Sequence, residues 1–282
     1  MKKIIVSTNC QTAGVFESLS RHLRGFVVTA LPQNRLKKRI YEPEEFNNSI
    51  VLYSNSTSDS IIELKKQTPF DSICIPEIQF SAFHPDLTYA FDKRTNSITN
   101  YHWNSRIVAW SYNHDIPVEK VVSLFRWEVY EKLNYFNVWA NSVERLRKIW
   151  MATDLSNETF EAFFLSAKRS GIFMHGINHP TAAAFDSLCR LILKKFFYLT
   201  DFKPSMIDTL SGNIFPVYPD IARNLSVAGG GYCWRVNGIL LDGLRDFVAW
   251  AFRGYTEQNI RPGDLVVSEK IDGIDEILFS SL

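Results

Sequence analysis

Short β-branched runs alternate with segments of helical periodicity over the first hundred residues, and this alternation constrains the fold more than any other feature. Four runs are predicted as strands, at residues 4–6, 26–31, 49–53 and 71–75, and the first is expected to be buried. Val15, Leu19 and Leu23 fall on one face of a helix between the first two runs, and a second helix is predicted at 60–67. Strand and helix repeated in this way indicate a parallel sheet with flanking helices.

The pattern becomes helical from about residue 105. Helices are predicted at 106–112, 117–125, 126–136, 138–152, 156–168 (or from 154), 182–197 and 240–253, with a strand at 232–236 and a surface strand or irregular tail after Gly263. We therefore predict an α/β protein with a small N-terminal parallel sheet followed by a predominantly helical region. Residues 1–100 would carry the nucleophile, and residues 101–282 would complete the same site, either as a second part or within one integrated domain.

Charge and cysteine usage narrow the class of protein. The formal net charge is +1 over 282 residues, which does not indicate a nucleic-acid partner. The four cysteines form no Cys-x-x-Cys pair, so neither a metal site nor a redox motif is predicted, and the expected compartment is reducing and cytoplasmic. No apolar run approaches the ~20 residues of a transmembrane helix, although peripheral membrane association stays open.

Cys10 lies between the first strand and the first helix, after Ser7, Thr8 and Asn9 break the apolar run. A thiol at a helix N-terminus has its pKa lowered and becomes a better nucleophile. Ligands of parallel sheets bind beyond the carboxyl ends of the strands, where Cys10 is expected. The alternative is that Cys10 is a small buried residue.

His84 and Asp86 follow the fourth predicted strand and are expected at the same sheet edge as Cys10. His84 could act as a general base for the thiol, with Asp86 orienting its ring. Alternatively, His84 fills the surface or the core, and Asp86 caps a turn.

Asn178 and His179 precede the helix predicted at 182–197, with Thr181 at its start. A helix N-terminus can hold an anion or a developing oxyanion. The alternative is that Asn178 or Thr181 only caps the helix and His179 has no role. The basic cluster at 35–39 is expected either to bind a phosphate or to be a solvent-exposed face. The glycines at 229–231 are expected either to bind a phosphate or to form a plain loop.

Several familiar chemistries are missing from the sequence. A Cys-x5-Arg phosphatase loop would need arginine where Phe16 stands. Neither a Gly-x-Ser-x-Gly elbow nor a His-Glu-x-x-His motif occurs, and no Gly-x-Gly-x-x-Gly follows the first strand. Serine hydrolases of the elbow type, zincins and dinucleotide-binding enzymes are therefore not indicated.

Three short motifs together resemble a known family. They are Asn9-Cys10-Gln11, Phe83-His84-Pro85-Asp86 and Asn178-His179-Pro180-Thr181, with a weaker fourth match at 215–219. In this order they resemble the WcbI-like polysaccharide biosynthesis proteins of bacterial capsule loci. This chain has Thr8 where the family usually has glycine before the Asn-Cys-Gln motif.

The resemblance implies a coenzyme A-binding acyltransferase that moves an acyl group from acyl-CoA to a sugar hydroxyl of a surface polysaccharide. The catalytic candidates are Cys10, His84, His179 and Asp86, and the coenzyme-binding candidates are Asn9, Gln11, Arg21, Arg24, Asn178 and Thr181. The planar guanidinium group of arginine matches the oxygens of a phosphate. For this reason Arg21, Arg24 and the basic cluster at 35–39 are the candidates for binding the phosphates of the coenzyme.

Two versions of the mechanism stay open at this stage. In the first, Cys10 forms an acyl-enzyme; in the second, a histidine deprotonates the sugar hydroxyl directly and Cys10 lines the site. Two other functions are alternatives: a thiol-dependent deacylase or esterase acting on glycans, and a non-catalytic glycan- or nucleotide-binding module.

Overall fold

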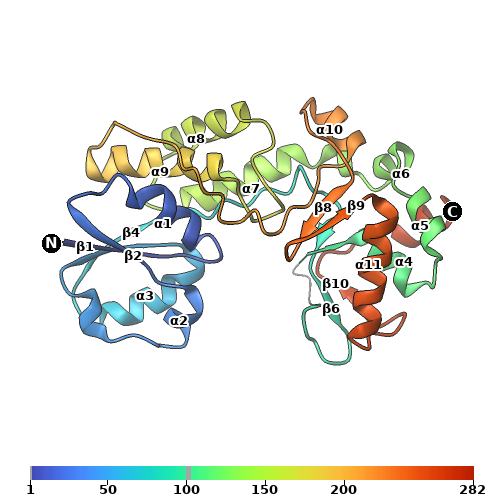
Figure 1. The fold of residues 1–282 in the computed structure, drawn as a ribbon, viewed down its shortest axis with the longest axis horizontal. Helices are drawn as coiled ribbons and strands as arrows, with labels where there is room; N and C mark the ends of the chain where they lie inside the picture. Colours follow the sequence, from blue (N-terminus) through green and yellow to red (C-terminus); the bar gives the residue numbers. More distant parts are fainter. Residues whose placement is uncertain (1, 100–102) are drawn as a thin grey trace. The chain divides into compact units, whose positions relative to one another are not determined.

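The computed structural model describes residues 2–99 and 103–282, and the chain divides into two compact units (Figure 1). The first unit comprises Met1–Phe80 and Asn141–Ser211, and the second comprises Ser81–Ala140 and Gly212–Leu282. Each unit is thus assembled from two segments that are distant in the sequence. The boundary expected near residue 100 from the change of pattern stays a prediction.

A four-stranded parallel sheet forms the centre of the first unit, in the order β2-β1-β3-β4. Its strands are β1 (Lys2–Ser7), β2 (Phe26–Ala30), β3 (Ser49–Tyr53) and β4 (Asp71–Cys74). Ile4 of the central strand pairs in register with Val28 on one side and Ile50 on the other. Ile4 and Val6 have no exposed surface, as a strand covered on both faces requires. The predicted fold class and all four predicted strands are confirmed.

The strand order reverses direction at β1. The chain passes from β1 to β2 on one side of the sheet and then returns to β3 on the other side of β1. The carboxyl ends of β1 and β3 therefore flank the position where ligands of open parallel sheets bind. Thr57, in the loop after β3, donates a hydrogen bond of 3.0 Å to the carbonyl of Ser7 at the end of β1.

Helices complete the first unit, and those predicted from periodicity at 60–67, 138–152, 156–168 and 182–197 are confirmed. The helices are α1 (Thr12–Ser20), α2 (Gln33–Lys37), α3 (Ser58–Lys65), α7 (Trp139–Met151), α8 (Asn157–Arg169) and α9 (Ala182–Phe197), with 3-10 turns at Pro43–Phe46 and Asn55–Thr57. α1 ends with Arg21 as its C-cap. Within residues 2–99 and 103–282, no helix combines the length and apolar character needed to cross a membrane.

Close packing of α1 on α9 depends on Gly14. A Cβ atom at Gly14 would stand 2.1 Å from the ring of Phe185, which is itself buried. Ser18 of α1 also donates a hydrogen bond to the carboxylate of Asp186, whose other oxygen accepts from the backbone N–H of Ser205 at 2.7 Å. These contacts join the helix that follows Cys10 to the helix that follows His179.

The second unit combines helices with three two-stranded antiparallel pairs, β5-β7, β6-β10 and β8-β9. The strands are β5 (Leu87–Thr88), β6 (Ala90–Asp92), β7 (Asn104–Ser105), β8 (Cys233–Val236), β9 (Ile239–Asp242) and β10 (Leu265–Val267). The helices are α4 (Arg106–Asn113), α5 (Val118–Ser123), α6 (Trp127–Lys132), α10 (Pro219–Leu225), α11 (Leu244–Glu257) and α12 (Ile274–Phe279), with a 3-10 turn at Tyr135–Asn137.

Two sequence predictions in this unit are wrong. Residues 240–242 were expected to begin a helix but belong to β9, because Asn237 and Gly238 both have positive φ and form a tight hairpin turn with β8. The helix begins only after Gly243. The tail after Gly263 contains a helix, α12, in addition to a strand.

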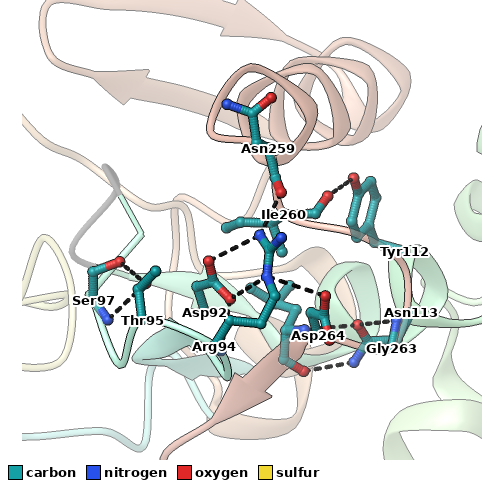
Figure 2. Close-up of polar contacts among 11 residues, drawn as sticks. Asp92, Arg94, Thr95, Ser97, Tyr112, Asn113, Asn259, Ile260, Gly263 and Asp264 are labelled. Carbon is teal, nitrogen blue, oxygen red and sulfur yellow. Dashed lines mark hydrogen bonds and ion pairs between the residues drawn. The ribbon is translucent and has the colours of Figure 1, made fainter.

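Arg94 anchors the pairing of β6 with β10 (Figure 2). Its guanidinium forms ion pairs with Asp92 at 3.0 Å and Asp264 at 3.2 Å, and donates to the carbonyl of Asn259. Asn113 accepts hydrogen bonds from two backbone N–H groups of the turn that precedes β10, each 3.1 Å long. The cluster is therefore a structural clamp between two chain segments.

We expect Gly14→Ala to destabilise the protein by about 1–3 kcal/mol, because the added methyl group overlaps the buried ring of Phe185 and forces a neighbour to shift. Gly25→Ala is the matched control, since a Cβ there meets nothing within 4 Å. Urea unfolding followed by circular dichroism measures both. Equal stability of the two variants would show that α1 does not depend on this close approach.

We expect the stabilising effect of Asp92 to depend on pH. Hydrogen bonds from the side chain and backbone of Arg94 lower the pKa of Asp92. A lowered folded-state pKa stabilises the protein above the unfolded value of about 3.9, and this stabilisation is lost as pH falls through the folded-state pKa. The stability difference between wild type and Asp92→Asn should therefore be constant near neutral pH and shrink in acid. Asp71→Asn, at an exposed ion pair with Lys2, should show little effect.

Candidate functional site

The turn after β1 holds Cys10 at its apex through the side chains of its neighbours. The Asn9 side-chain oxygen accepts a hydrogen bond of 2.9 Å from the N–H of Gln11, and the Asn9 carbonyl accepts one of 2.9 Å from the Thr12 hydroxyl. The N–H of Thr8 donates to the same hydroxyl at 2.9 Å. Thr8 does not have positive φ, so this turn needs no glycine at that position. Cys10 itself is exposed to solvent.

The side-chain amide of Gln11 joins three loops of the first unit. Its oxygen accepts from the N–H of Ile78 at 3.0 Å, and its NH₂ donates to the carbonyls of Ile78 at 2.8 Å and Asn178 at 3.1 Å. Beside it, the N–H of Phe80 donates to the carbonyl of Ile177 at 2.9 Å. Cys10 and His179 are each one residue away from the bonded pair Gln11–Asn178. The structure thus brings the first and third sequence motifs together.

The electrostatic setting of Cys10 is the opposite of the one expected from its position before a helix. The surrounding protein desolvates the thiol, and the negative charge of Glu77 adds to this effect; together they raise the pKa of Cys10 to about 11. The backbone N–H of Cys10 lowers the pKa by a smaller amount. At neutral pH the thiol is therefore the dominant form of Cys10. The expectation of a lowered pKa is wrong, because desolvation and the charge of Glu77 outweigh the backbone N–H, and α1 begins only at Thr12.

Glu77 is the residue of this site that the sequence analysis missed. It follows β4 and is buried, with one carboxylate oxygen accepting a hydrogen bond of 2.6 Å from Ser54 and the other accepting one of 3.2 Å from Gln79. Ser54 follows β3, so loops from neighbouring strands converge beside Cys10. The available signal was that Glu77, like Cys10, comes directly after a predicted strand.

The loop before α9 is closed by its own backbone. The N–H of His175 donates to the carbonyl of His179 at 2.7 Å, and Thr181 caps α9 by accepting from the N–H of Ala184 at 3.4 Å. The N–H of Ala182 donates to the carboxylate of Asp208 at 3.2 Å. A carboxylate of the protein thus occupies part of the helix start at which an anion was expected.

His84 and Asp86 lie in the second unit, where both are buried. The Nε2 atom of His84 is 2.8 Å from the carbonyl oxygen of Phe215, and Asp86 accepts hydrogen bonds of 2.8 Å from the hydroxyls of Tyr135 and Tyr218. Burial and the charge of Asp86 raise the pKa of both tyrosines well above 10. The sequence motifs at 83–86 and 215–219 therefore meet, around a pocket with room for about one water molecule.

Arg21 and Arg24 lie beyond the far end of α1, at the opposite edge of the sheet from Cys10. The nine residues of α1 that separate this end from the turn of Cys10 rise ~14 Å along the helix axis. Arg21 pairs with Glu17 and donates to the Ser205 hydroxyl at 3.0 Å, whereas Arg24 is exposed. Their contact with a coenzyme stays a prediction.

The basic cluster at 35–39 lies nearer the edge that carries Cys10. α2 begins just after the carboxyl end of β2, and the side chain of Gln33 donates to the carbonyl of Ser56 at 3.3 Å, in the loop that follows β3. Arg35, Lys37 and Lys38 are exposed there. This placement makes the cluster the nearer source of positive charge for an anionic ligand at the switch point.

The fold and the site define an α/β protein whose polar loops and one exposed thiol meet at the switch point of a parallel sheet. The family model of the polysaccharide biosynthesis enzyme WcbI matches residues 3–196, which is more than half of the chain. The chain therefore belongs to the WcbI polysaccharide biosynthesis enzyme family.

A solved structure of WcbI has the same fold. It aligns with a TM-score of 0.67 over 99% of this chain and 94% of that chain, at 12% sequence identity. It is described as a novel polysaccharide biosynthesis enzyme, in its native form without a disulfide bond between coenzyme A and one of its cysteines. None of the curated proteins matches this sequence.

We expect Glu77→Gln to make Cys10 more reactive, because the substitution removes the negative charge that opposes ionisation of the thiol. Alkylation of Cys10 by iodoacetamide, followed by peptide mass spectrometry, should become roughly three- to tenfold faster, and desolvation should still keep it slower than for a free cysteine. Cys233, an exposed cysteine of the second unit, is the internal reference. An unchanged ratio of the two rates would contradict the role assigned to Glu77.

Proposed function

We propose that this protein transfers an acyl group from acyl-coenzyme A to a sugar hydroxyl during synthesis of a bacterial surface polysaccharide. The observation that supports this best is the position of Cys10. It is exposed at the apex of the turn after β1, at the switch point of the sheet, with the loop of Asn178 and His179 bonded beside it through Gln11. A substrate that reaches Cys10 therefore also reaches that loop.

Coenzyme A is the proposed donor because of family membership and the description of the related WcbI structure, which names coenzyme A together with a cysteine. Two other cysteines of this chain, Cys74 and Cys189, are buried, and Cys233 lies in the second unit. Cys10 is thus the exposed thiol of the parallel-sheet unit, and we place the thioester end of the coenzyme there. The basic cluster at 35–39 is the proposed contact for its phosphates.

The raised pKa of Cys10 supports direct transfer rather than an acyl-enzyme, since the thiolate is the nucleophilic form of cysteine and is scarce at neutral pH. In direct transfer, a histidine accepts the proton of the sugar hydroxyl, and the oxygen attacks the thioester carbonyl. The carbon–sulfur bond then breaks, and the coenzyme leaves as the thiol after it receives the proton. The loop of His175 and His179, which is bonded to Gln11 through Asn178, brings histidines to the turn of Cys10.

The neighbours of Cys10 divide the remaining tasks in this proposal. The side-chain oxygen of Asn9 accepts a hydrogen bond from the backbone N–H of Gln11. The NH₂ group of Asn9 is therefore the part of this amide that we propose as the donor to a developing oxyanion. Gln11 is bonded on both sides of its amide, so it shapes the site through Asn178 and Ile78. Thr181 fixes the start of α9, and Asp86 with His84 organises the second unit.

We expect Cys10→Ala to retain coenzyme A binding and acyl transfer, because the thiol lines the site without attacking. A thermal-shift titration with coenzyme A, acetyl-CoA and adenosine measures binding through the concentration-dependent rise in Tm. Intact-mass spectrometry of the wild type incubated with acetyl-CoA should show no acetyl-enzyme. Cys233→Ser is the matched control for loss of an exposed thiol.

Two results would contradict these statements separately. An acetylated wild-type protein that loses the modification in Cys10→Ala would establish the acyl-enzyme version. Absence of any Tm shift with coenzyme A or acetyl-CoA at millimolar concentration would remove the proposed donor itself.

A further inference from the structure

His175 and Asp208 form a hydrogen-bonded pair that no sequence motif indicated. The Nε2 atom of His175 is 2.8 Å from a carboxylate oxygen of Asp208. That carboxylate is fixed in place, because it also accepts backbone hydrogen bonds from Ala182 at 3.2 Å and Leu210 at 3.3 Å. The side chain of His175 is 14% exposed, so the pair is mostly enclosed while the imidazole is still accessible.

The carboxylate of Asp208 determines which nitrogen of His175 is basic. An ionised carboxylate only accepts hydrogen bonds, so Nε2 of His175 carries the proton and Nδ1 carries the lone pair. Burial alone would raise the pKa of Asp208, but the hydrogen bond and charge of His175, with the N–H groups of Ala182 and Leu210, lower it. The carboxylate is therefore ionised at neutral pH, in the state that orients a histidine base.

His175 belongs to the loop that contacts the turn of Cys10. Its backbone N–H is bonded to the carbonyl of His179, and between these two residues lies Asn178, which accepts from Gln11 at 3.1 Å. His175 is thus on the loop whose tip is joined to the residue after Cys10. The Nδ1 atom of His179 is buried, whereas the side chain of His175 keeps 14% of its surface exposed.

We propose that His175 is the general base of the acyl transfer and that Asp208 is its positioning residue; this rests on the function proposed above. Nδ1 of His175 removes the proton of the sugar hydroxyl as the hydroxyl oxygen bonds to the thioester carbon. Asp208 stabilises the resulting imidazolium. When the carbon–sulfur bond breaks, the imidazolium returns the proton to the sulfur of the coenzyme, so that the pair ends in its starting state.

Chemical modification of the wild-type protein tests the location. Diethyl pyrocarbonate should modify His175, and saturating acetyl-CoA at ten times its Kd should slow this modification about tenfold, since about one site in ten stays empty. Peptide mass spectrometry measures the rate at each histidine, and His22, at the far end of α1, is the reference that acetyl-CoA should leave unchanged.

Side-chain ¹H–¹⁵N NMR tests the role of Asp208. The wild type should show His175 with the proton on Nε2, and Asp208→Asn should increase the form with the proton on Nδ1. Asp201→Asn, at an exposed aspartate of the same segment, should not. With a sugar acceptor that supports turnover, His175→Gln should lower kcat by roughly 10²–10⁴-fold and leave the acetyl-CoA-dependent Tm shift unchanged.

The outcomes separate the two proposals. Binding of acetyl-CoA without protection of His175, or a wild-type His175 with the proton on Nδ1, would overturn the assignment of the base and leave the proposed function standing. Absence of an acetyl-CoA-dependent Tm shift would overturn both.

Discussion

The hydrogen bonds of one buried amide, that of Gln11, hold the candidate site together. A buried amide that lacks partners costs about 1–3 kcal/mol per unsatisfied group, so its partners are strongly constrained to stay in place. The partners of the Gln11 side chain are the backbone N–H and carbonyl of Ile78, after β4, and the carbonyl of Asn178, before α9. The turn that carries Cys10 can therefore keep its geometry only while both loops are docked, and the chemistry at this sheet edge depends on their cooperation.

Local patterns in the sequence were enough to predict the architecture of the first unit. Its four strands appear in the sequence as short apolar runs, most clearly the central β1, whose Ile4 and Val6 are fully buried, and Thr181 caps α9 as its residue type indicates. The prediction failed at residues 240–242, where helical spacing was equally compatible with a strand and the Asn237-Gly238 turn decided the outcome. The contact of Gln11 with Asn178 spans 167 residues and leaves no periodic trace. Likewise, a unit built from two distant segments cannot be seen in a composition change along the chain.

The pKa of Cys10 shows why the site was harder to predict than the fold. The sequence supplies the local effect, a helix that begins two residues later and favours the thiolate. It does not supply desolvation by the folded protein or the charge of Glu77, which lies 67 residues farther along the chain. In the structure these two effects prevail and the pKa rises to about 11. A local dipole argument thus gave the wrong sign because the dominant contributions are tertiary.

Two carboxylates then determine which group can act as the base in the proposed reaction. Glu77 adds to the desolvation that opposes ionisation of Cys10, so in the proposed reaction the neutral thiol does not compete with the sugar hydroxyl as a nucleophile. Asp208 orients His175 instead, because its carboxylate oxygen lies 2.8 Å from Nε2 and accepts the hydrogen bond of that nitrogen, which leaves Nδ1 as the proton acceptor in the proposed reaction. Both carboxylates lie in the first unit, in segments that lead to or from the Gln11 contacts. In the proposed reaction, the same docking that positions Cys10 therefore also favours proton transfer through histidine over covalent catalysis through cysteine.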